Sequence, residues 1–226
     1  MNFANLKSPV LIFDCDGVLI DSERILNQVF RECLEMVGLQ LSFEETIRRF
    51  KGRSTTECIG IAERLLGQPL DVELVNSLYE SKGKERLLTQ LQPIGGIVEA
   101  LQRLPYRKCV ASNSSQDYIL TGLGLTGLTS YFSEGIFSAS EVKLGKPAPD
   151  LFLHAASKLK VAPSDCVVIE DSVVGVQAAI AAKMTVFGFV DLTPEEELKN
   201  AGASTFHKMT ELPDLLDNYV LNRPTA

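Results

Sequence analysis

Residues 10–19 read Val-Leu-Ile-Phe-Asp-Cys-Asp-Gly-Val-Leu, an apolar run that leads directly into two aspartates and a glycine. A short, continuously apolar run is typical of a parallel strand that is buried on both faces. Asp14 and Asp16 then follow the end of the strand, where open α/β sheets place their chemistry. Because side chains alternate along a strand, we expect both carboxylates to point the same way. An isolated Asp-Xaa-Asp-Gly sequence is more often an ordinary turn, so the rest of the chain decides its meaning.

Similar apolar, β-rich runs recur along the chain, with helix-like segments between the later ones. These runs cover residues 10–13, 108–112, 135–138, 166–170 and 184–189. Strands that alternate with helices predict an α/β fold with a doubly wound, Rossmann-like parallel sheet and helices on both of its faces.

The interval between the first and second strands is far too long for a single crossover helix. Apolar residues recur in it at helical spacing, which predicts helices at residues 22–38, 42–50, 54–66 and 72–91. Ser42 and Glu45 have the spacing of a capping box at the second of these helices. We therefore expect a catalytic core made of residues 1–19 and 92–226, and a helical cap domain inserted between them at residues 20–91.

The composition restricts the partners and the compartment. The chain has 226 residues and a formal net charge of −7 at pH 7, so it lacks the basic field that attracts nucleic acids or anionic membranes. Five scattered cysteines without a Cys-x-x-Cys pair predict free thiols in a reducing cytoplasm. No signal-peptide core or membrane span is visible, and the two histidines, both expected at the surface, are too few for a multi-histidine zinc site. We expect a cytoplasmic protein, most simply a monomer.

Polar residues also follow the second and third apolar runs. Ser112, Asn113 and Ser114 come at the end of a run, where hydroxyl and main-chain N–H groups can hold phosphate oxygens. Lys146 precedes Pro147, which favours an extended backbone before the next helix. A lysine in such a loop is more often a solvated charge than a functional group.

Two acids, Glu170 and Asp171, end the apolar run at residues 166–170. Carboxylates at the end of a buried strand are costly unless a cation or hydrogen-bond donors meet them. Ser172, which follows, is suited to cap the next helix. The pair therefore indicates a cation or a set of donors at this strand end.

Taken in order, these groups resemble the four motifs of the haloacid dehalogenase superfamily of aspartate-nucleophile phosphatases. The similarity covers nearly the whole chain, and the β-phosphoglucomutase-like branch, which has a helical cap after its first strand, matches best. Val18 departs from the threonine that many members carry, and no role rests on it. The matching positions are Asp14-Cys-Asp16-Gly17-Val18, Ser112, Lys146-Pro147 and Glu170-Asp171.

The resemblance implies a hydrolase that forms an aspartyl-phosphate. Asp14 would be the nucleophile, and Asp16 would protonate the leaving oxygen and later deprotonate the attacking water. Lys146 would screen the charges of Asp14 and a phosphoryl oxygen, while Ser112 and the main-chain N–H of Asn113 would bind the other oxygens.

The resemblance also implies Mg²⁺ as the cofactor. Its ligands would be a carboxylate oxygen of Asp14, the main-chain carbonyl of Asp16 and the carboxylate of Asp171. Glu170 would lie at or just outside the metal's coordination shell. A metal and a lysine are needed because a phosphate monoester is doubly charged and repels a carboxylate nucleophile.

Substrate choice is expected to come from the cap, which in similar enzymes closes over the site and excludes water. In the similar mutases and sugar phosphatases a Lys-Gly-containing cap loop contacts the substrate. Lys51, Gly52 and Arg53 are therefore the substrate-binding candidates in the cap, together with Asn113 in the core. A solvated basic turn explains the cap residues equally well, and Lys82 is a weaker candidate.

Other activities of the superfamily give alternatives. Dehalogenases and phosphonoacetaldehyde hydrolases do without the second aspartate, so Asp16 counts against both, although Lys51 could in principle form a Schiff base. The mutases carry a cap histidine where this chain has Leu26, which favours phosphate release over transfer. Pyrophosphatase activity is a further alternative that the sequence leaves open. The complete set of motifs argues against a phosphate-binding regulator without catalytic activity. We expect hydrolysis of small phosphorylated metabolites, in particular a hexose phosphate or a sugar-acid phosphate such as 6-phosphogluconate.

Overall fold

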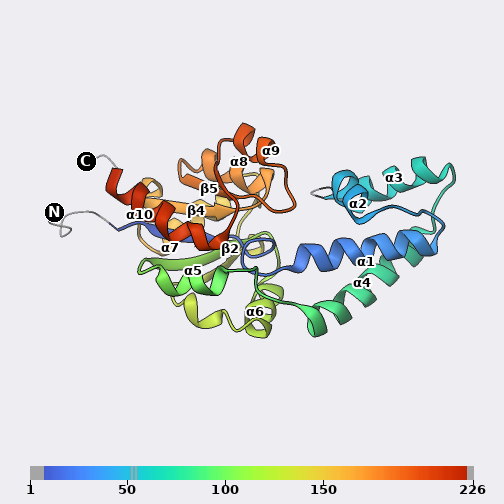
Figure 1. Ribbon diagram of the computed structural model, residues 1–226, viewed down its shortest axis with the longest axis horizontal. Helices are drawn as coiled ribbons and strands as arrows, with labels where there is room; N and C mark the ends of the chain where they lie inside the picture. Colours follow the sequence, from blue (N-terminus) through green and yellow to red (C-terminus); the bar gives the residue numbers. More distant parts are fainter. Residues whose placement is uncertain (1–7, 52, 54, 223–226) are drawn as a thin grey trace. The chain divides into compact units, whose positions relative to one another are not determined.

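The computed structural model describes residues 8–51, 53 and 55–222 of the chain (Figure 1). The chain separates into two compact units. The core unit joins the residues before Asp21 to those from Pro93 onward, and the cap unit spans Asp21–Gln92. Within the described residues, no helix is long and apolar enough to span a membrane.

The core unit is built on a six-stranded sheet in which every neighbouring pair is parallel. The strands are β1 (Val10–Phe13), β2 (Arg107–Ser112), β3 (Ile136–Ser138), β4 (Cys166–Glu170), β5 (Thr185–Phe189) and β6 (Ser204–Phe206). Their order in the sheet is β3-β2-β1-β4-β5-β6, so the chain winds outward from β1 and then returns to wind outward the other way. This confirms the predicted doubly wound, Rossmann-like α/β class.

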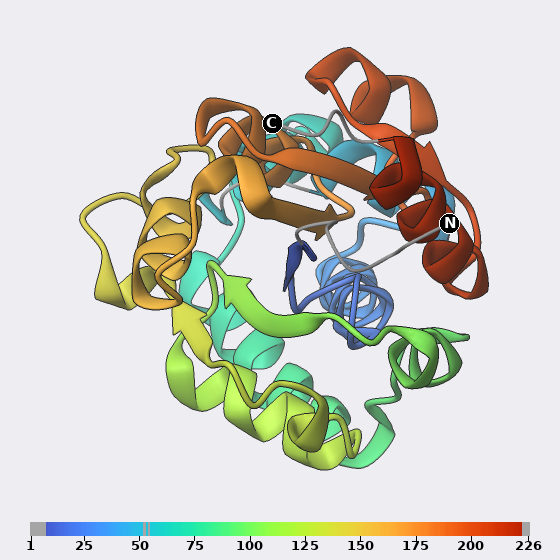
Figure 2. The same ribbon diagram turned by 90° about the vertical axis from the view of Figure 1, so that its left-hand side faces the viewer.

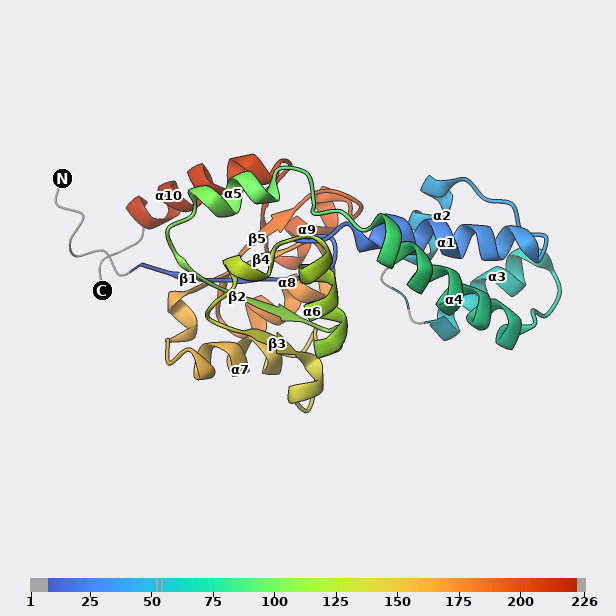
Figure 3. The ribbon, with the colours of Figure 1, turned by 90° about the horizontal axis from the view of Figure 1, so that it is seen from below.

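Helices cover both faces of the sheet, and Figures 2 and 3 show α5 and α10 on the face opposite α7. Ile12 of β1 belongs to an apolar cluster with residues of α7 and α8, such as Phe152 and Val176. On the other face, Phe187 of β5 packs edge to face on Tyr219 of α10, with ring centroids 6.1 Å apart. Because β1 is covered on both sides, all four of its residues are apolar and buried. The core helices are α5 (Ile97–Arg103), α6 (Gln116–Leu125), α7 (Asp150–Lys158), α8 (Val173–Ala181), α9 (Glu195–Ala201) and α10 (Leu212–Asn222), with short 3₁₀ turns at Thr129–Tyr131, Ala139–Glu141, Pro163–Asp165 and Met209–Glu211.

The cap unit consists of helices, as its apolar spacing predicts. The described helices are α1 (Ser22–Met36), α2 (Phe43–Phe50), α3 (Thr55–Leu66) and α4 (Val72–Gln90). α1 and α4 lie side by side, and Arg86 of α4 donates two hydrogen bonds, of 2.9 and 2.7 Å, to the carboxylate of Glu32 on α1 (Figures 1 and 3). The predicted capping box is confirmed: Ser42 Oγ accepts a hydrogen bond from the Glu45 N–H, and the Glu45 carboxylate accepts one from the Ser42 N–H.

Some details differ from the sequence-based expectation. β6, Ser204–Phe206, was missed because it is a short edge strand with only one buried residue. β3 begins at Ile136, since Gly135 has a φ of 140° that lies outside strand geometry. His154 was expected at the surface, but its side chain is only 23% exposed and its ring packs edge to face on Phe137. All five cysteines are buried and free, as predicted.

Candidate active site

The register of the sheet brings two acidic strand ends together. Phe13 of β1 pairs with Ile169 of β4, and the main-chain N–H of Asp14 donates to the Ile169 carbonyl at 3.0 Å. Asp14 therefore emerges beside Glu170, the last residue of β4. β1 and β4 are the strands between which the winding direction reverses, and open α/β sheets leave a ligand-binding crevice at that point.

Lys146, from the loop before α7, lies between these two acids. Its Nζ is 2.6 Å from Asp14 Oδ1 and 2.7 Å from Glu170 Oε1. The Lys146 side chain is only 3% exposed, and its Nζ lies 5.0 Å from the centre of the Phe152 ring. A buried ammonium is tolerated only where it is paired, so the interpretation of Lys146 as a solvated loop charge is wrong.

Burial and charge shift the ionisation of this pair. Burial raises the pKa of Asp14 to about 7, although the charge of Lys146 opposes that shift. Burial alone lowers the pKa of Lys146, but the charges of Asp14 and Glu170 outweigh it and raise that pKa above its usual value. Lys146 is therefore a permanent cation at this site.

Glu170 is held from all sides. Its Oε2 accepts hydrogen bonds from the main-chain N–H groups of Asp171 and Ser172, both at 3.0 Å, and from Ser172 Oγ at 2.8 Å. Its Oε1 receives the Lys146 ammonium. Ser172 also caps α8, because its Oγ accepts from the Gly175 N–H at 3.1 Å. With four donors on its two oxygens, Glu170 is fixed, and it fixes Lys146 in turn.

Two glycines make room for these acids. A Cβ added to Gly175 would lie 1.8 Å from Glu170 Oε1, which no real contact allows. A Cβ added to Gly17 would lie 2.5 Å from Asp171 Oδ2, and Gly17 has a positive φ of 74°. The loop after β1 therefore approaches Asp171 closely enough to bring main-chain atoms beside its carboxylate.

The donor set fits a hard divalent cation. Carboxylate oxygens of Asp14, Glu170 and Asp171 all lie within 4.8 Å of one another, and all three residues are buried. Lys146 pairs with two of the three, Asp14 and Glu170. A divalent cation with a preference for oxygen ligands would add positive charge among the three carboxylates.

Asp16 has a different environment from Asp14. Its Oδ2 accepts a hydrogen bond of 2.7 Å from Ser114 Oγ, and its Oδ1 accepts one of 3.0 Å from the Tyr118 hydroxyl. Ser114 follows β2, and Tyr118 lies in the first turn of α6. The sequence indicates Ser114 as a turn residue whose hydroxyl can hold phosphate oxygens, and Tyr118 has no predicted role. Neither spacing nor hydropathy relates the two residues to Asp16.

Ser112 and Asn113 extend the cluster from the end of β2. Ser112 is buried, and its Oγ accepts the Ser114 N–H at 3.2 Å. The side chain of Asn113 binds the main chain of Lys146 in both directions: Oδ1 accepts the Lys146 N–H at 2.9 Å, and Nδ2 donates to the Lys146 carbonyl at 3.1 Å. Asn113 thus positions the lysine loop, a role that the sequence did not indicate.

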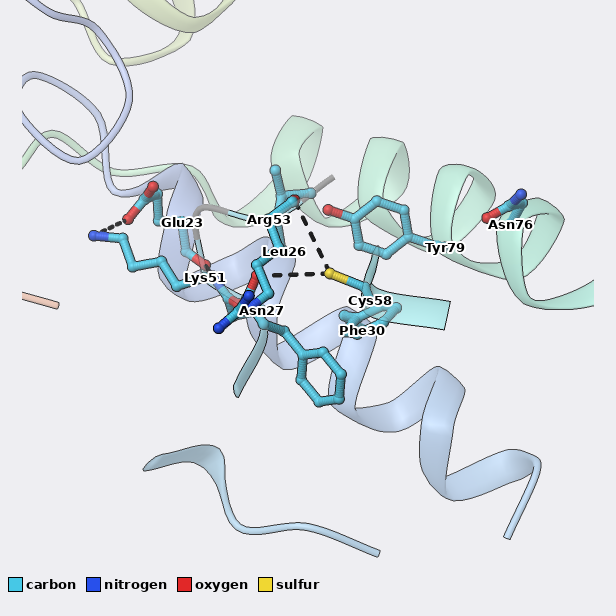
Figure 4. Close-up of a pocket in the computed structure, with 10 residues that line it drawn as sticks. Glu23, Leu26, Asn27, Phe30, Lys51, Arg53, Cys58, Asn76 and Tyr79 are labelled. Atoms are coloured by element: carbon cyan, nitrogen blue, oxygen red, sulfur yellow. Dashed lines mark hydrogen bonds and ion pairs between the residues drawn. The ribbon is translucent and has the colours of Figure 1, made fainter. Parts of the chain in front are cut away.

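The candidate residues of the cap line a cavity of about 210 Å³ within the cap unit (Figure 4). Lys51 Nζ lies 2.7 Å from Glu23 Oε2, and the Lys51 side chain is 10% exposed, so the interpretation as a solvated turn does not hold for this residue. Arg53 is exposed, and its Nε donates to the Arg49 carbonyl at 2.9 Å. Gly52 lies outside the described residues. The other lining residues are Leu26, Asn27, Phe30, Phe50, Cys58, Asn76 and Tyr79.

Comparison with known proteins identifies the family. A model of haloacid dehalogenase-like hydrolases matches residues 9–183. The chain belongs to this family. The 6-phosphogluconate phosphatase of Escherichia coli (strain K12) is 30% identical over 205 residues, which cover 91% of this chain and 93% of that enzyme. Other relatives of this hydrolase are phosphatases of fructose 1-phosphate and of phosphorylated carbohydrates.

Solved structures agree with this assignment. A haloacid dehalogenase-like protein of unknown function from Agrobacterium tumefaciens str. C58 has a TM-score of 0.87 and 37% identity, over 93% of this chain and 98% of that one. A Thermotoga maritima protein proposed to be a β-phosphoglucomutase has a TM-score of 0.77 and 29% identity, over 93% and 99% of the two chains. The predicted family, its β-phosphoglucomutase-like branch and the class of phosphoric monoester hydrolase are confirmed.

The contact between Gly175 and Glu170 makes a prediction for stability. Gly175→Ala forces Glu170 away from Lys146 or from its three other donors, so we expect the free energy of unfolding in urea to fall by ~1.5–3 kcal/mol, the loss of a charge-assisted hydrogen bond. Gly124 is the matched control, since it is also helical and a Cβ there meets nothing within 4 Å. Gly124→Ala should raise the free energy of unfolding by ~0.4–1 kcal/mol. Equal effects of the two substitutions would contradict the proposed fit.

Proposed function

We propose that this hydrolase is a Mg²⁺-dependent phosphatase of small phosphorylated metabolites, above all sugar or sugar-acid phosphates, and that it works through an aspartyl-phosphate. The observation that carries the proposal is the buried Lys146 ammonium held between Asp14 and Glu170 at the switch point of the sheet. A carboxylate fixed beside a buried cation is suited to attack an anionic group that would otherwise repel it.

The first half-reaction transfers the phosphoryl group to the enzyme. A carboxylate oxygen of Asp14 attacks phosphorus, a new P–O bond forms, and the bond from phosphorus to the substrate oxygen breaks. Asp16 gives its proton to the departing oxygen, which leaves as an alcohol. Lys146 neutralises charge on the phosphoryl oxygens, and the Ser112 hydroxyl with the Asn113 N–H binds the others.

The second half-reaction releases phosphate. Asp16, now ionised, takes a proton from a water molecule whose oxygen attacks the phosphorus of the aspartyl-phosphate. The bond from phosphorus to the Asp14 oxygen breaks, and Asp14 returns as a carboxylate. Asp16 regains its proton in the same step, so the enzyme ends as it began.

We propose that Asp14, Asp171 and the main-chain carbonyl of Asp16 hold Mg²⁺, with Glu170 at or just outside its shell. The mutual proximity of the Asp14, Glu170 and Asp171 oxygens supports this assignment. When bound, the metal supplies Lewis acidity that offsets the charge of the phosphate. Glu170 has four donors on its two oxygens, which favours its placement outside the inner shell.

We propose that residues 1–19 and 92–226 carry the chemistry and that the helical residues 20–91 select the substrate. The cap cavity offers the amides of Asn27 and Asn76, the Tyr79 hydroxyl and the Lys51–Glu23 ion pair, a mixture of donors and acceptors suited to sugar hydroxyls. The exposed guanidinium of Arg53 is suited to a carboxylate, as in a sugar acid. Gly52 stays a candidate for main-chain contact. The five buried free cysteines support a reducing cytoplasm, and a monomer is the simplest state.

The test of substrate class uses purified protein with Mg²⁺ and a panel of 6-phosphogluconate, fructose 1-phosphate, glucose 6-phosphate, pyrophosphate and β-glucose 1-phosphate. We expect phosphate release with the highest kcat/KM on a sugar or sugar-acid phosphate, because discrimination lies in that ratio. Leu26 is apolar and supplies no cap base, so β-glucose 1-phosphate should yield no glucose 6-phosphate. Formation of glucose 6-phosphate, or a preference for pyrophosphate, would contradict the proposal in favour of the corresponding alternative.

Removal of the nucleophile gives a second prediction. Asp14→Asn preserves the shape of the side chain, but its amide cannot attack phosphorus. Turnover should therefore fall below about a hundredth of the wild-type rate, a larger fall than removal of the weakest general acids or bases causes. Circular dichroism should show an unchanged fold, and the exposed Glu196→Gln serves as a control for loss of one acidic charge. Activity of Asp14→Asn above about a hundredth of the wild-type rate would exclude Asp14 as the nucleophile.

Metal dependence gives a third prediction. Chelation should abolish phosphate release and Mg²⁺ should restore it, whereas Ca²⁺ should bind and inhibit because its larger, looser shell misplaces the nucleophile. Mg²⁺ should also raise the melting temperature of the wild type by mass action, and this rise should be lost in Asp171→Asn. Full activity in excess chelator would exclude the metal site.

A further inference from the structure

The carboxylate of Asp16 is held by two hydroxyl groups that come from one short stretch of chain. Ser114 Oγ donates to Oδ2 at 2.7 Å, and the Tyr118 hydroxyl donates to Oδ1 at 3.0 Å. One donor thus fixes each carboxylate oxygen, which restricts rotation about both side-chain torsions of Asp16. We call Ser114 and Tyr118 the Asp16 cradle.

The cradle is itself rigidly positioned. Ser115 caps α6 by accepting the Tyr118 N–H, so the tyrosine stands at a fixed place in the first helical turn. Ser138 Oγ donates to the Ser114 carbonyl at 2.7 Å, and the Ser114 N–H donates to Ser112 Oγ at 3.2 Å. The main chain that carries both hydroxyls is therefore held at strand ends and at the start of α6. The side chain of Tyr118 adds few rotatable bonds.

We propose that Tyr118 and Ser114 are positioning residues that aim Asp16 at the leaving oxygen, an inference that rests on the proposed phosphatase function. Proton transfer requires the carboxyl group within hydrogen-bond reach of that oxygen, and small misplacements are costly in rate. Hydroxyl groups both donate and accept, so they can stay bonded to Asp16 before and after it gives up its proton. An ammonium group in their place could only donate, and its charge would favour the carboxylate form.

This role predicts a dependence on the leaving group. Phenolate is a more basic leaving group than p-nitrophenolate and needs protonation more, while the two aryl groups are close in size. Tyr118→Phe keeps the ring and removes only the hydroxyl. We expect kcat/KM for phenyl phosphate to fall about tenfold or more, which is a part of the ~10²–10⁴-fold rate acceleration that a general acid supplies. We expect kcat/KM for p-nitrophenyl phosphate to fall less than about threefold.

The experiment compares wild type, Tyr118→Phe, Ser114→Ala, Ser114→Thr and the control Tyr131→Phe, whose hydroxyl bonds only the exposed Gln102 among the described partners. Ser114→Thr keeps the hydroxyl and should recover much of the rate that Ser114→Ala loses. In an Asp16→Asn background, Tyr118→Phe should have no further effect, because it acts through Asp16. Tyr131→Phe should leave both substrates unaffected.

Two outcomes would overturn the inference. Equal losses on both aryl phosphates would mean that Tyr118 supports the fold or binds substrate, and a further loss in the Asp16→Asn background would mean that it does not act through Asp16. Melting temperatures of the variants separate loss of fold from loss of positioning. If the wild type hydrolyses neither aryl phosphate nor any member of the substrate panel, the proposed function itself fails, which is a different result from either of these.

Discussion

A single buried ammonium organises the chemistry-bearing end of the core unit. Lys146 reaches between the ends of β1 and β4 and pairs with an acid from each. A buried cation of this kind is destabilising unless its partners are held in place, and its partners are destabilising without it. Four donors therefore fix Glu170, and the Asn113 side chain fixes the lysine loop from the β2 side. These groups stabilise one another only when all of them are in place. The Glu170 carboxylate therefore needs the space that Gly175 leaves because it has no Cβ.

The strand order is what makes such a unit possible. β1 and β4 are neighbours in the sheet although more than 150 residues separate them in sequence, and the winding direction reverses between them. Their continuous apolar character and their acidic ends are visible in the sequence, so the fold class and the acidic positions could be predicted. The resemblance to the family then ordered the motifs along the chain. The burial of Lys146 could not be predicted from residue patterns, because it depends on contacts that no local pattern encodes.

Interactions between side chains far apart in sequence were not predictable. Tyr118 meets Asp16 across 102 residues, and Asn113 meets the Lys146 main chain across 33. Each residue type is ordinary where it stands, a tyrosine in a helix and an asparagine in a turn, so its role exists only in three dimensions. In the cap, Lys51 was predicted to contact a substrate, but its pairing with Glu23 depends on how α1 meets the loop after α2. β6 was missed for a local reason, because an edge strand needs few apolar residues.

Asp14 and Asp16 have contrasting surroundings, and the contrast follows their proposed tasks. Asp14 faces a permanent cation, whose charge opposes the rise in pKa that burial causes and so favours the carboxylate form that a nucleophile needs. Asp16 faces two hydroxyls, which can accept as well as donate and so suit a group that must lose and regain a proton in every cycle. The chemical character of the partner, rather than the aspartate itself, thus separates the two roles. Exchanging the partners would favour the ionised form of the proposed acid and deprive the proposed nucleophile of its counter-charge, so the two proposed roles depend on the surroundings that this fold supplies.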